Sequence, residues 1–316
     1  MMRSVFVVLT VLFGISCQAQ KIKLIIDADT GNEMDDMYAI ARALDSNDFE
    51  LMGLVSAHFN NPQMVTDSMW HNYSTKNINT VELSQRENEQ LLSEVNRSEI
   101  PHPQGCEKMV GFAWGFNHGT PVQYSEGVDF IITEAKKASP GNKLDIACLG
   151  PVTNVAAVIL AEPDIAKNIH LHILSMKYNP ETGVWNKNEF NARNDLNALD
   201  IVLDCTDLEL SIISGQVSGQ LVFERKDTQK RLFAYNNKIS QNLLTRWDFV
   251  NAGERWIMWD LALIESIIHP ELAKTEMVLT PPENVQRKVE AYTDIDEKKM
   301  EADFWESYQR LMEKLH

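Results

Sequence analysis

The sequence predicts an α/β fold: a doubly wound, mostly parallel open sheet with helices on both faces. Two observations support this prediction. Short apolar runs without alternation, at 22–26 and 144–149, are typical of strands buried on both faces, as in a parallel sheet. Segments with apolar residues at helical spacing follow such runs, beginning with 37–44. Strands that alternate with helices build a doubly wound sheet.

The other elements follow in chain order from the same signals. Further strands are expected at 49–57, 78–83, 169–176 and 208–213, and segments 276–280 and 285–291 resemble an edge hairpin. Helices are expected at 62–76, 125–138, 195–204, 229–250, 255–268 and 297–314, and the turn at 150–154 opens a helix that runs to Leu160. Residues 84–121 are expected to form helix and loop over the sheet, and 177–187 a polar loop.

Composition limits the classes of protein to which the chain can belong. Its 316 residues suit one large α/β domain or two small ones, and the absence of repeats and linkers favours a single domain over 20–316. The formal net charge of -16 argues against nucleic acid or an anionic membrane as partner. The same charge is compatible with a neutral, polar small molecule bound through a metal.

The first residues, 1–19, have the pattern of a secretory signal peptide. One arginine precedes an apolar core at 5–15, which is too short for a membrane span, and small residues follow. Cleavage after Ala19 would release a secreted or periplasmic protein. Cys17 offers the alternative of a lipidated cysteine, but Gly14 stands where a bacterial lipobox usually has leucine. The pattern therefore favours cleavage.

Three cysteines remain beyond the signal segment: Cys106, Cys148 and Cys205. An odd number without close spacing predicts neither a disulfide framework nor a thiolate metal site. Cys148 lies in an apolar run and Cys205 in a helical one, so we expect both to be small buried hydrophobes.

Four carboxylates, Asp27, Asp29, Asp35 and Asp36, lie where the first strand ends and the first helix begins. Ligands bind at this place in open α/β sheets. The helix dipole can stabilise two of the charges, but the others need a cation, because buried like charges repel one another. Oxygen ligands without nearby histidine or cysteine suit Ca²⁺ or Mg²⁺. The alternative is a solvated acidic loop with an N-capping aspartate, which suits an apolar strand poorly.

A further carboxylate, Asp260, lies inside the apolar segment 256–264. Such a carboxylate is expected to be buried and to need a partner, which a cap or a salt bridge could also supply. Polar residues also follow three other strands or lie in loops nearby, at 58–61, 149–154 and 188–191. Because strand ends in a parallel sheet converge on one rim, these groups are expected to gather there.

Four blocks of the sequence together resemble the nucleoside hydrolase family of the inosine–uridine preferring type. DADTGNEMDD at 27–36 resembles its signature, and LGPVTN at 149–154, EFN at 189–191 and WDLAL at 259–263 resemble its later blocks in family order. The resemblance extends from Lys21 to Ile268. It implies the corresponding fold and hydrolysis of the N-glycosidic bond of a ribonucleoside or related N-riboside, with release of base and ribose.

The resemblance also implies roles for individual residues. It implies a Ca²⁺ ion held by Asp29, Asp36, the backbone carbonyl of Leu149 and Asp260, with Asp29 as general base on a metal-bound water. Asp27 would support the loop. Contacts with the sugar hydroxyls would come from Asp35, Asn60, Glu189 and Asn191. Members of the family are commonly homodimers or homotetramers.

The expected chemistry suits these residue types. Cleavage of an N-glycosidic bond develops positive charge on the ribose ring, which a pocket rich in carboxylates stabilises. A bound calcium ion would keep those carboxylates ionised, fix vicinal hydroxyls and lower the pKa of its water.

The sequence departs from the family pattern at two places. The first block has two extra residues, so the loop must bulge before Asp35, and Asn32 and Glu33 gain the chance of contacts of their own. Trp259 stands where the best-studied branch has a histidine that protonates the leaving base, and indole is no useful proton donor at neutral pH. Trp259 could stack on a base or pack in the core.

Other histidines are candidates for the missing acid. His118, in an Asn-His-Gly loop, is the next candidate, and His58 is another. His170 and His172 alternate within a strand, which predicts a structural role. Without an acid, the leaving group would be one that departs easily, or not a purine at all.

Three other functions compete with the hydrolase. A periplasmic nucleoside- or sugar-binding protein that keeps the calcium site but lacks catalysis would explain Trp259. A phosphatase of the haloacid dehalogenase type would explain DxD after a buried strand, but the threonine lies one position too early. An EF-hand would need a glutamate at position twelve from Asp27, where Tyr38 stands.

Overall fold

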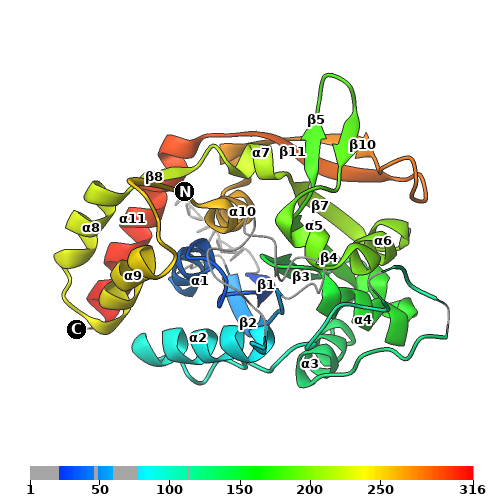
Figure 1. The fold of residues 1–316 in the computed structure, drawn as a ribbon, viewed down its shortest axis with the longest axis horizontal. Coiled ribbons are helices and arrows are strands. Elements are labelled where there is room, and N and C mark those ends of the chain that lie inside the picture. The colour runs from blue at the N-terminus through cyan, green and yellow to red at the C-terminus, as the bar shows by residue number, and fades with distance from the viewer. Residues whose placement is uncertain (1–20, 46–48, 60–76, 113, 118, 316) are drawn as a thin grey trace, which may run out of the picture.

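A seven-stranded sheet forms the centre of the molecule in the computed structural model, which describes residues 21–45, 49–59, 77–112, 114–117 and 119–315. The strand order is β10-β11-β7-β4-β3-β1-β2, and every neighbouring pair is parallel except β10 and β11. This confirms the doubly wound, mostly parallel sheet (Figure 1). Its strands are β1 (Ile22–Ala28), β2 (Phe49–Ser56), β3 (Leu144–Cys148), β4 (Ile169–Leu174), β7 (Glu209–Ile213), β10 (Ala273–Leu279) and β11 (Lys288–Ile295).

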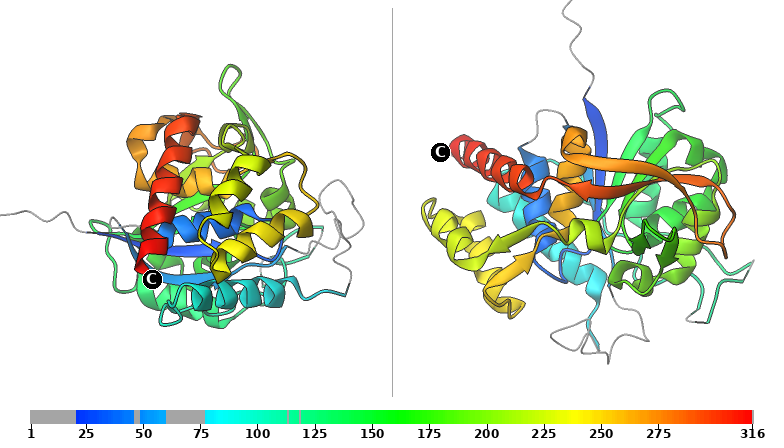
Figure 2. Two further views of the ribbon diagram at one scale, coloured as in Figure 1. Left: turned by 90° about the vertical axis from the view of Figure 1, so that its left-hand side faces the viewer. Right: turned by 90° about the horizontal axis from the view of Figure 1, so that it is seen from above.

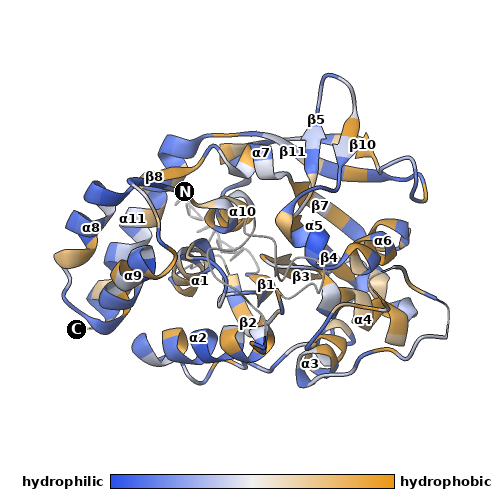
Figure 3. Ribbon diagram, viewed as in Figure 1, coloured by the Kyte–Doolittle hydropathy of each residue, from blue (hydrophilic) through white to orange (hydrophobic). Residues whose placement is uncertain are grey.

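Helices cover both faces of this sheet (Figures 1 and 2). Side chains of α1, α10 and α11 belong to one large apolar cluster, and those of α3, α4 and α6 to a second. Apolar residues face inward in both layers, and hydrophilic ones occupy the periphery (Figure 3). The helices of the described residues are α1 (Asp35–Leu44), α2 (Thr80–Glu94), α3 (Glu126–Ala135), α4 (Thr153–Ala161), α5 (Phe190–Asn194), α6 (Leu196–Asp204), α7 (Gly215–Ser218), α8 (Arg225–Phe233), α9 (Lys238–Phe249), α10 (Trp259–Ile268) and α11 (Glu297–Lys314).

Two expected elements are wrong in type. Residues 78–83 were expected to form a strand but begin α2, because the side chain of Asn79 caps the helix by accepting from the backbone nitrogen of Glu82. Residues 177–187 were expected to be a polar loop but contain the hairpin of β5 (Lys177–Asn179) and β6 (Val184–Asn186). Trp185 ties the hairpin to the molecule through a 2.8 Å hydrogen bond from its Nε1 to the carbonyl of Leu279.

Two expected helices are interrupted. The segment 229–250 divides into α8 and α9, because Asn236 has a φ of 46° and Asn237 caps α9 at Ser240. The segment 255–268 begins as strand β9 (Arg255–Ile257), which pairs with β8 (Val222–Glu224), and only then becomes α10. Asp260 therefore lies in the first turn of α10 rather than in the middle of a helix.

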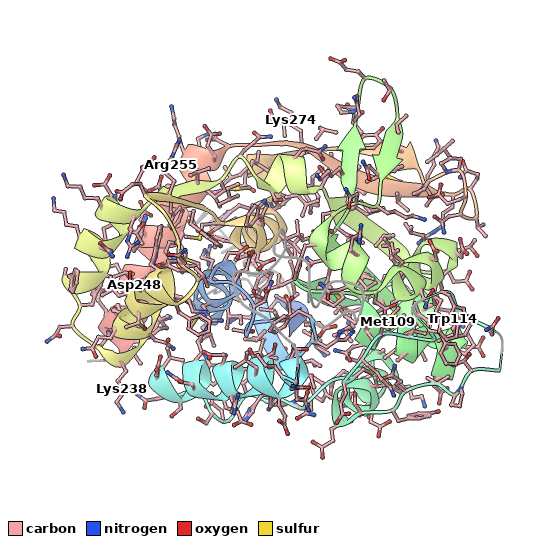
Figure 4. The ribbon with its side chains drawn as sticks, in the orientation of Figure 1. Met109, Trp114, Lys238, Asp248, Arg255 and Lys274 are labelled. Atoms are coloured by element: carbon pink, nitrogen blue, oxygen red, sulfur yellow. The ribbon has the colours of Figure 1, made fainter. Side chains whose placement is uncertain are left out.

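The expected hairpin near the carboxyl end is present, but only one strand is at the edge. β10 is the edge strand, whereas β11 lies between β10 and β7. Lys274 on β10 points away from the body of the protein (Figure 4) and pairs with Asp294 at 2.8 Å. A charged edge strand discourages pairing with another chain. The expected terminal helix, 297–314, coincides with α11.

The three described cysteines differ in burial. Cys106, Cys148 and Cys205 are free thiols, and Cys148 is buried as expected. Cys205, which was also expected to be buried, is half-buried. In the described part of the chain, no helix has the length and apolarity that a membrane span requires. The expected signal peptide at 1–19 and the helix at 62–76 lie outside the described residues.

A buried arginine holds together the helices that carry the acidic residues. Arg42 of α1 is 2% exposed, and its Nε donates to Oε1 of Glu265 in α10 at 2.8 Å. The guanidinium also pairs with Asp303 of α11. Because α1 begins with two aspartates and α10 carries Asp260 in its first turn, this bridge fixes the relative position of both helix starts.

We expect Arg42→Ala to lower the free energy of unfolding by about 3–5 kcal/mol, because it leaves a buried carboxylate without its charge partner. Urea unfolding followed by circular dichroism measures the change. Arg97→Ala is the matched control, since Arg97 forms an exposed pair with Glu99, and such pairs contribute little. Equal effects of the two substitutions would contradict the role of Arg42.

Candidate active site

Four carboxylates from three separate segments meet at the carboxyl end of β1. Asp29 follows β1, Asp35 and Asp36 begin α1, and Asp260 lies in the first turn of α10. Carboxylate oxygens of Asp35, Asp36 and Asp260 all lie within 4.8 Å of one another. We call these four residues the acidic cup. Each is at most 4% exposed, so their charges are removed from water.

Positive charge balances the acidic cup only in part: Arg246 lowers the pKa of Asp36, but burial and Asp35 raise it by more. One oxygen on each carboxylate is buried and without a hydrogen-bond partner among the described residues. Burial, together with the neighbouring aspartates, raises the pKa values of Asp29 and Asp260 well above their usual range and that of Asp36 to about 7. Orphaned, mutually repelling carboxylate oxygens fit a hard divalent cation such as Ca²⁺.

The loop between β1 and α1 is held in place by contacts with the block at 149–154. Asp27 is fully buried and accepts from Nδ2 of Asn154 at 2.8 Å, which connects the first acidic block to the block at 149–154. Burial raises the pKa of Asp27 to about 7. A Cβ added to Gly150 would lie 2.7 Å from Oδ1 of Asp29, so only glycine permits this close approach. The structure places Asp27 behind the cup, as a support of the loop.

The bulge caused by the two extra residues is fixed by an arginine. Arg246 of α9 is buried, and its Nε and Nη2 donate to the carbonyls of Glu33 and Thr30, each at 2.9 Å. The turn within the loop is closed by the nitrogen of Asn32, which donates to the carbonyl of Asp29 at 2.8 Å. Sequence reasoning missed Arg246, because nothing in a helix far along the chain indicates which loop it contacts.

A cavity of about 440 Å³ opens above the acidic cup. Its walls include all four cup residues, the extra loop residues Asn32 and Glu33, and Leu149, Glu189, Asn191 and Trp259. The structure thus brings together the predicted residues Asp29, Asp35, Asp36, Leu149, Glu189, Asn191, Trp259 and Asp260 at one cavity. The predicted residues Asn60 and His118 lie outside the described residues.

Glu189 and Asn191 are held in place by the backbone around them. Glu189 caps α5 and accepts from the backbone nitrogens of Asn191 and Ala192, each at 3.0 Å. The amide of Asn191 donates to the carbonyls of Leu149 at 2.6 Å and Leu174 at 3.1 Å. Burial raises the pKa of Glu189. These contacts fix two polar side chains on the cavity wall before any ligand binds.

Trp259 lies between the core and the cavity. It lines the cavity, packs against the larger apolar cluster and contacts Trp256 edge to face, with ring centroids 6.3 Å apart. Core packing, one of the two alternatives expected from the sequence, therefore describes part of this side chain, and stacking on a base stays a prediction.

Three further residues on the cavity wall were missed. Lys177, Gln216 and Ile257 line the same cavity as Trp259. Lys177 and Gln216 come shortly after the ends of β4 and β7, which was the signal that could have identified them. Ile257 belongs to β9, a strand that the sequence did not predict.

The other histidines considered as an acid lie elsewhere. His58 is fully buried, its Nε2 lies 2.8 Å from Oγ1 of Thr153, and burial lowers its pKa to about 4. It does not line the cavity above the cup. His170 and His172 contact Asp145 near the beginnings of β3 and β4, at the opposite end of the strands from the cup.

Comparisons with known proteins show the family to which the chain is related. The model of a family described as inosine-uridine preferring nucleoside hydrolase matches residues 24–307. A probable uridine nucleosidase of Arabidopsis thaliana is 26% identical over 241 residues, which cover 70% of this chain and 67% of that protein. A solved plant nucleoside hydrolase superposes with a TM-score of 0.67 at 17% identity, over 92% of this chain and 99% of that one. A purine-preferring ribonucleoside hydrolase from Gardnerella vaginalis has the same TM-score and coverage at 19% identity.

Proposed function

The chain belongs to the inosine-uridine preferring nucleoside hydrolase family and is an N-ribohydrolase, and we propose that it depends on a calcium ion held in the acidic cup. The observation that supports the ion is the set of orphaned oxygens on Asp29, Asp35, Asp36 and Asp260. Asp29, Asp36, Asp260 and the carbonyl of Leu149 would hold it. A carbonyl oxygen has two lone pairs, so the carbonyl of Leu149 can accept the hydrogen bond from Asn191 and still bind the calcium ion.

A bound calcium ion would keep the cup ionised at neutral pH and supply positive charge where the water and the sugar hydroxyls meet. Asp29 then acts as general base: its carboxylate takes the proton from the water that attacks the anomeric carbon. As the bond to the base breaks, positive charge develops on the ribose ring. The carboxylates around the ring stabilise that charge in a site with little water.

The sugar would be positioned by groups that are already fixed. Asp35, Glu189 and Asn191 line the cavity on both sides of the cup, and we propose that they bind the ribose hydroxyls, together with Asn60. Because backbone contacts hold Glu189 and Asn191 in place, little conformational entropy is lost when the sugar binds.

The leaving base would face Trp259, and His118 remains the residue that we propose as its proton donor. In Trp259→Leu, we expect KM for a nucleoside to rise about tenfold with a smaller change in kcat, because base–aromatic stacking contributes about 1–3 kcal/mol. Trp259→Phe keeps an aromatic face and is the control. Steady-state kinetics of ribose release gives KM and kcat for both variants, and an unchanged KM in Trp259→Leu would show that the indole does not stack on the base.

Assays with a panel of purine and pyrimidine nucleosides distinguish the proposed hydrolase from a binding protein that has the same calcium site. We expect ribose to be released, with Ca²⁺ present, from at least one nucleoside. Thermal stabilisation by nucleosides without any ribose release would favour the binding protein instead.

We further propose that residues 1–19 are removed on export and that the protein is periplasmic or secreted. The amino-terminal sequence of the mature protein tests this: a start at Gln20 is expected, whereas a lipid on Cys17 would show a membrane anchor. A homodimer or homotetramer, also proposed from the family, is tested by light scattering.

A further inference from the structure

A second cluster of possible metal ligands lies on the sheet at the opposite end of its strands from the acidic cup. Asp145 of β3 and His170 and His172 of β4 offer ligand atoms that all lie within 4.8 Å of one another. Oδ1 of Asp145 is 2.8 Å from Nε2 of His172 and 3.3 Å from Nδ1 of His170. The strand register explains the cluster, because Asp145 and His170 are direct neighbours across β3 and β4.

A chain of hydrogen bonds continues from His170 across the sheet. Its Nε2 lies 2.9 Å from Oγ of Ser211 on β7, and that hydroxyl donates to Oε2 of Glu290 on β11 at 2.7 Å. A serine hydroxyl has one proton, so Nε2 of His170 must donate to Ser211. Nδ1 of the same ring faces the carboxylate of Asp145, which also accepts. The protein alone satisfies both contacts only with a doubly protonated ring.

A metal ion bound to Nδ1 of His170 would take the place of the second proton, so that a neutral ring could make both contacts. Metal-bound histidines commonly donate their other nitrogen to a hydroxyl or carboxylate, and the Ser211–Glu290 chain is such a partner. Nε2 is the ring nitrogen of His172 that faces Asp145, and its contact with Oδ1 places it within reach of the same ion. Two imidazoles and a carboxylate suit Zn²⁺ rather than Ca²⁺.

We propose that Asp145, His170 and His172 form a zinc-type metal site, with solvent in the fourth position. The site is accessible, because the side chains of Asp145 and His170 are 20% and 22% exposed. A hollow lined by Glu209, Ser211 and Glu290, together with Lys143, Arg287 and Lys288, adjoins it. The ion would link β3 to β4 at their amino-terminal ends and stabilise the folded state. This proposal does not depend on the function of the acidic cup.

The test uses untagged full-length protein stripped with a chelator and then saturated with Ca²⁺ to fill the acidic cup. Calorimetric titration with Zn²⁺ is expected to show one equivalent bound and, at a hundredfold excess over Kd, a Tm higher by about 5 °C. In His170→Gln the zinc affinity is expected to fall at least tenfold. His102→Gln removes a half-buried histidine outside the cluster and should bind zinc as the native protein does.

Binding of Co²⁺ tests independently which residues are the metal ligands. We expect Co²⁺ to produce the visible absorption of a four-coordinate site in the native protein and to lose it in His170→Gln. Ribose release by His170→Gln shows whether this variant is folded. If it is not, Asp145→Asn takes its place in the experiment. No zinc binding beside saturating Ca²⁺, or zinc affinity unchanged in the folded variant, would overturn the proposal.

Discussion

Asp29→Asn is expected to lower kcat by about 10²- to 10⁴-fold, because the substitution removes the general base and leaves a side chain of nearly the same size. In the absence of calcium, the variant should be at least as stable as the native protein. Asp29 is 2% exposed and repelled by Asp36, Glu33 and Asp35, so a neutral amide relieves an unfavourable buried charge. Loss of activity with retained or increased stability is the signature of a catalytic carboxylate.

Glu33→Gln is the matched control, because Glu33 also lines the cavity and carries a carboxylate but is not among the proposed calcium ligands. Ribose release and thermal unfolding, measured on both variants with saturating Ca²⁺, give the comparison. If Asp29→Asn kept full turnover, or if both variants lost activity equally, Asp29 would not be the base.

Asp260→Asn is expected to weaken calcium binding by about 10²-fold or more, since removal of one buried charge from a paired set costs about 3–5 kcal/mol. Asp260 comes from α10, more than two hundred positions after Asp36, yet their oxygens belong to the same cluster. At saturating Ca²⁺ much of the activity should return, because Asp260 holds the ion rather than the proton.

Calcium titration of the chelator-treated variants, followed by calorimetry, measures this effect. Asp303→Asn serves as the control, because Asp303 is also an acidic partner of a buried network, the one around Arg42, but lies away from the cup. Calcium affinity in Asp260→Asn equal to that of the native protein would show that Asp260 is no ligand.

Much of the fold could be predicted because the decisive signals are local. The apolar run before Asp27 and the apolar spacing through α1 and α11 leave few alternatives. Errors arose where one residue decides between structures. Asn79 converts an apolar stretch into a helix start, and Asn236, with its positive φ, divides a long helical pattern into two.

The candidate site was predictable to the extent that it follows strand ends. Asp29, Leu149 and Glu189 could be placed at one rim, because parallel strands share the direction of their carboxyl ends. Arg246 and Ile257 could not, since a helix packed from the far end of the chain and a short unpredicted strand bring them there. Their contacts depend on tertiary packing, which no local pattern encodes.

The most direct test of the calcium site is ribose release by native protein that has been stripped with EDTA, measured as Ca²⁺ is returned. We expect the stripped protein to be inactive and to regain full turnover as one calcium ion binds per chain. Full turnover in the presence of excess EDTA, with no calcium bound by calorimetry, would contradict a calcium-dependent acidic cup.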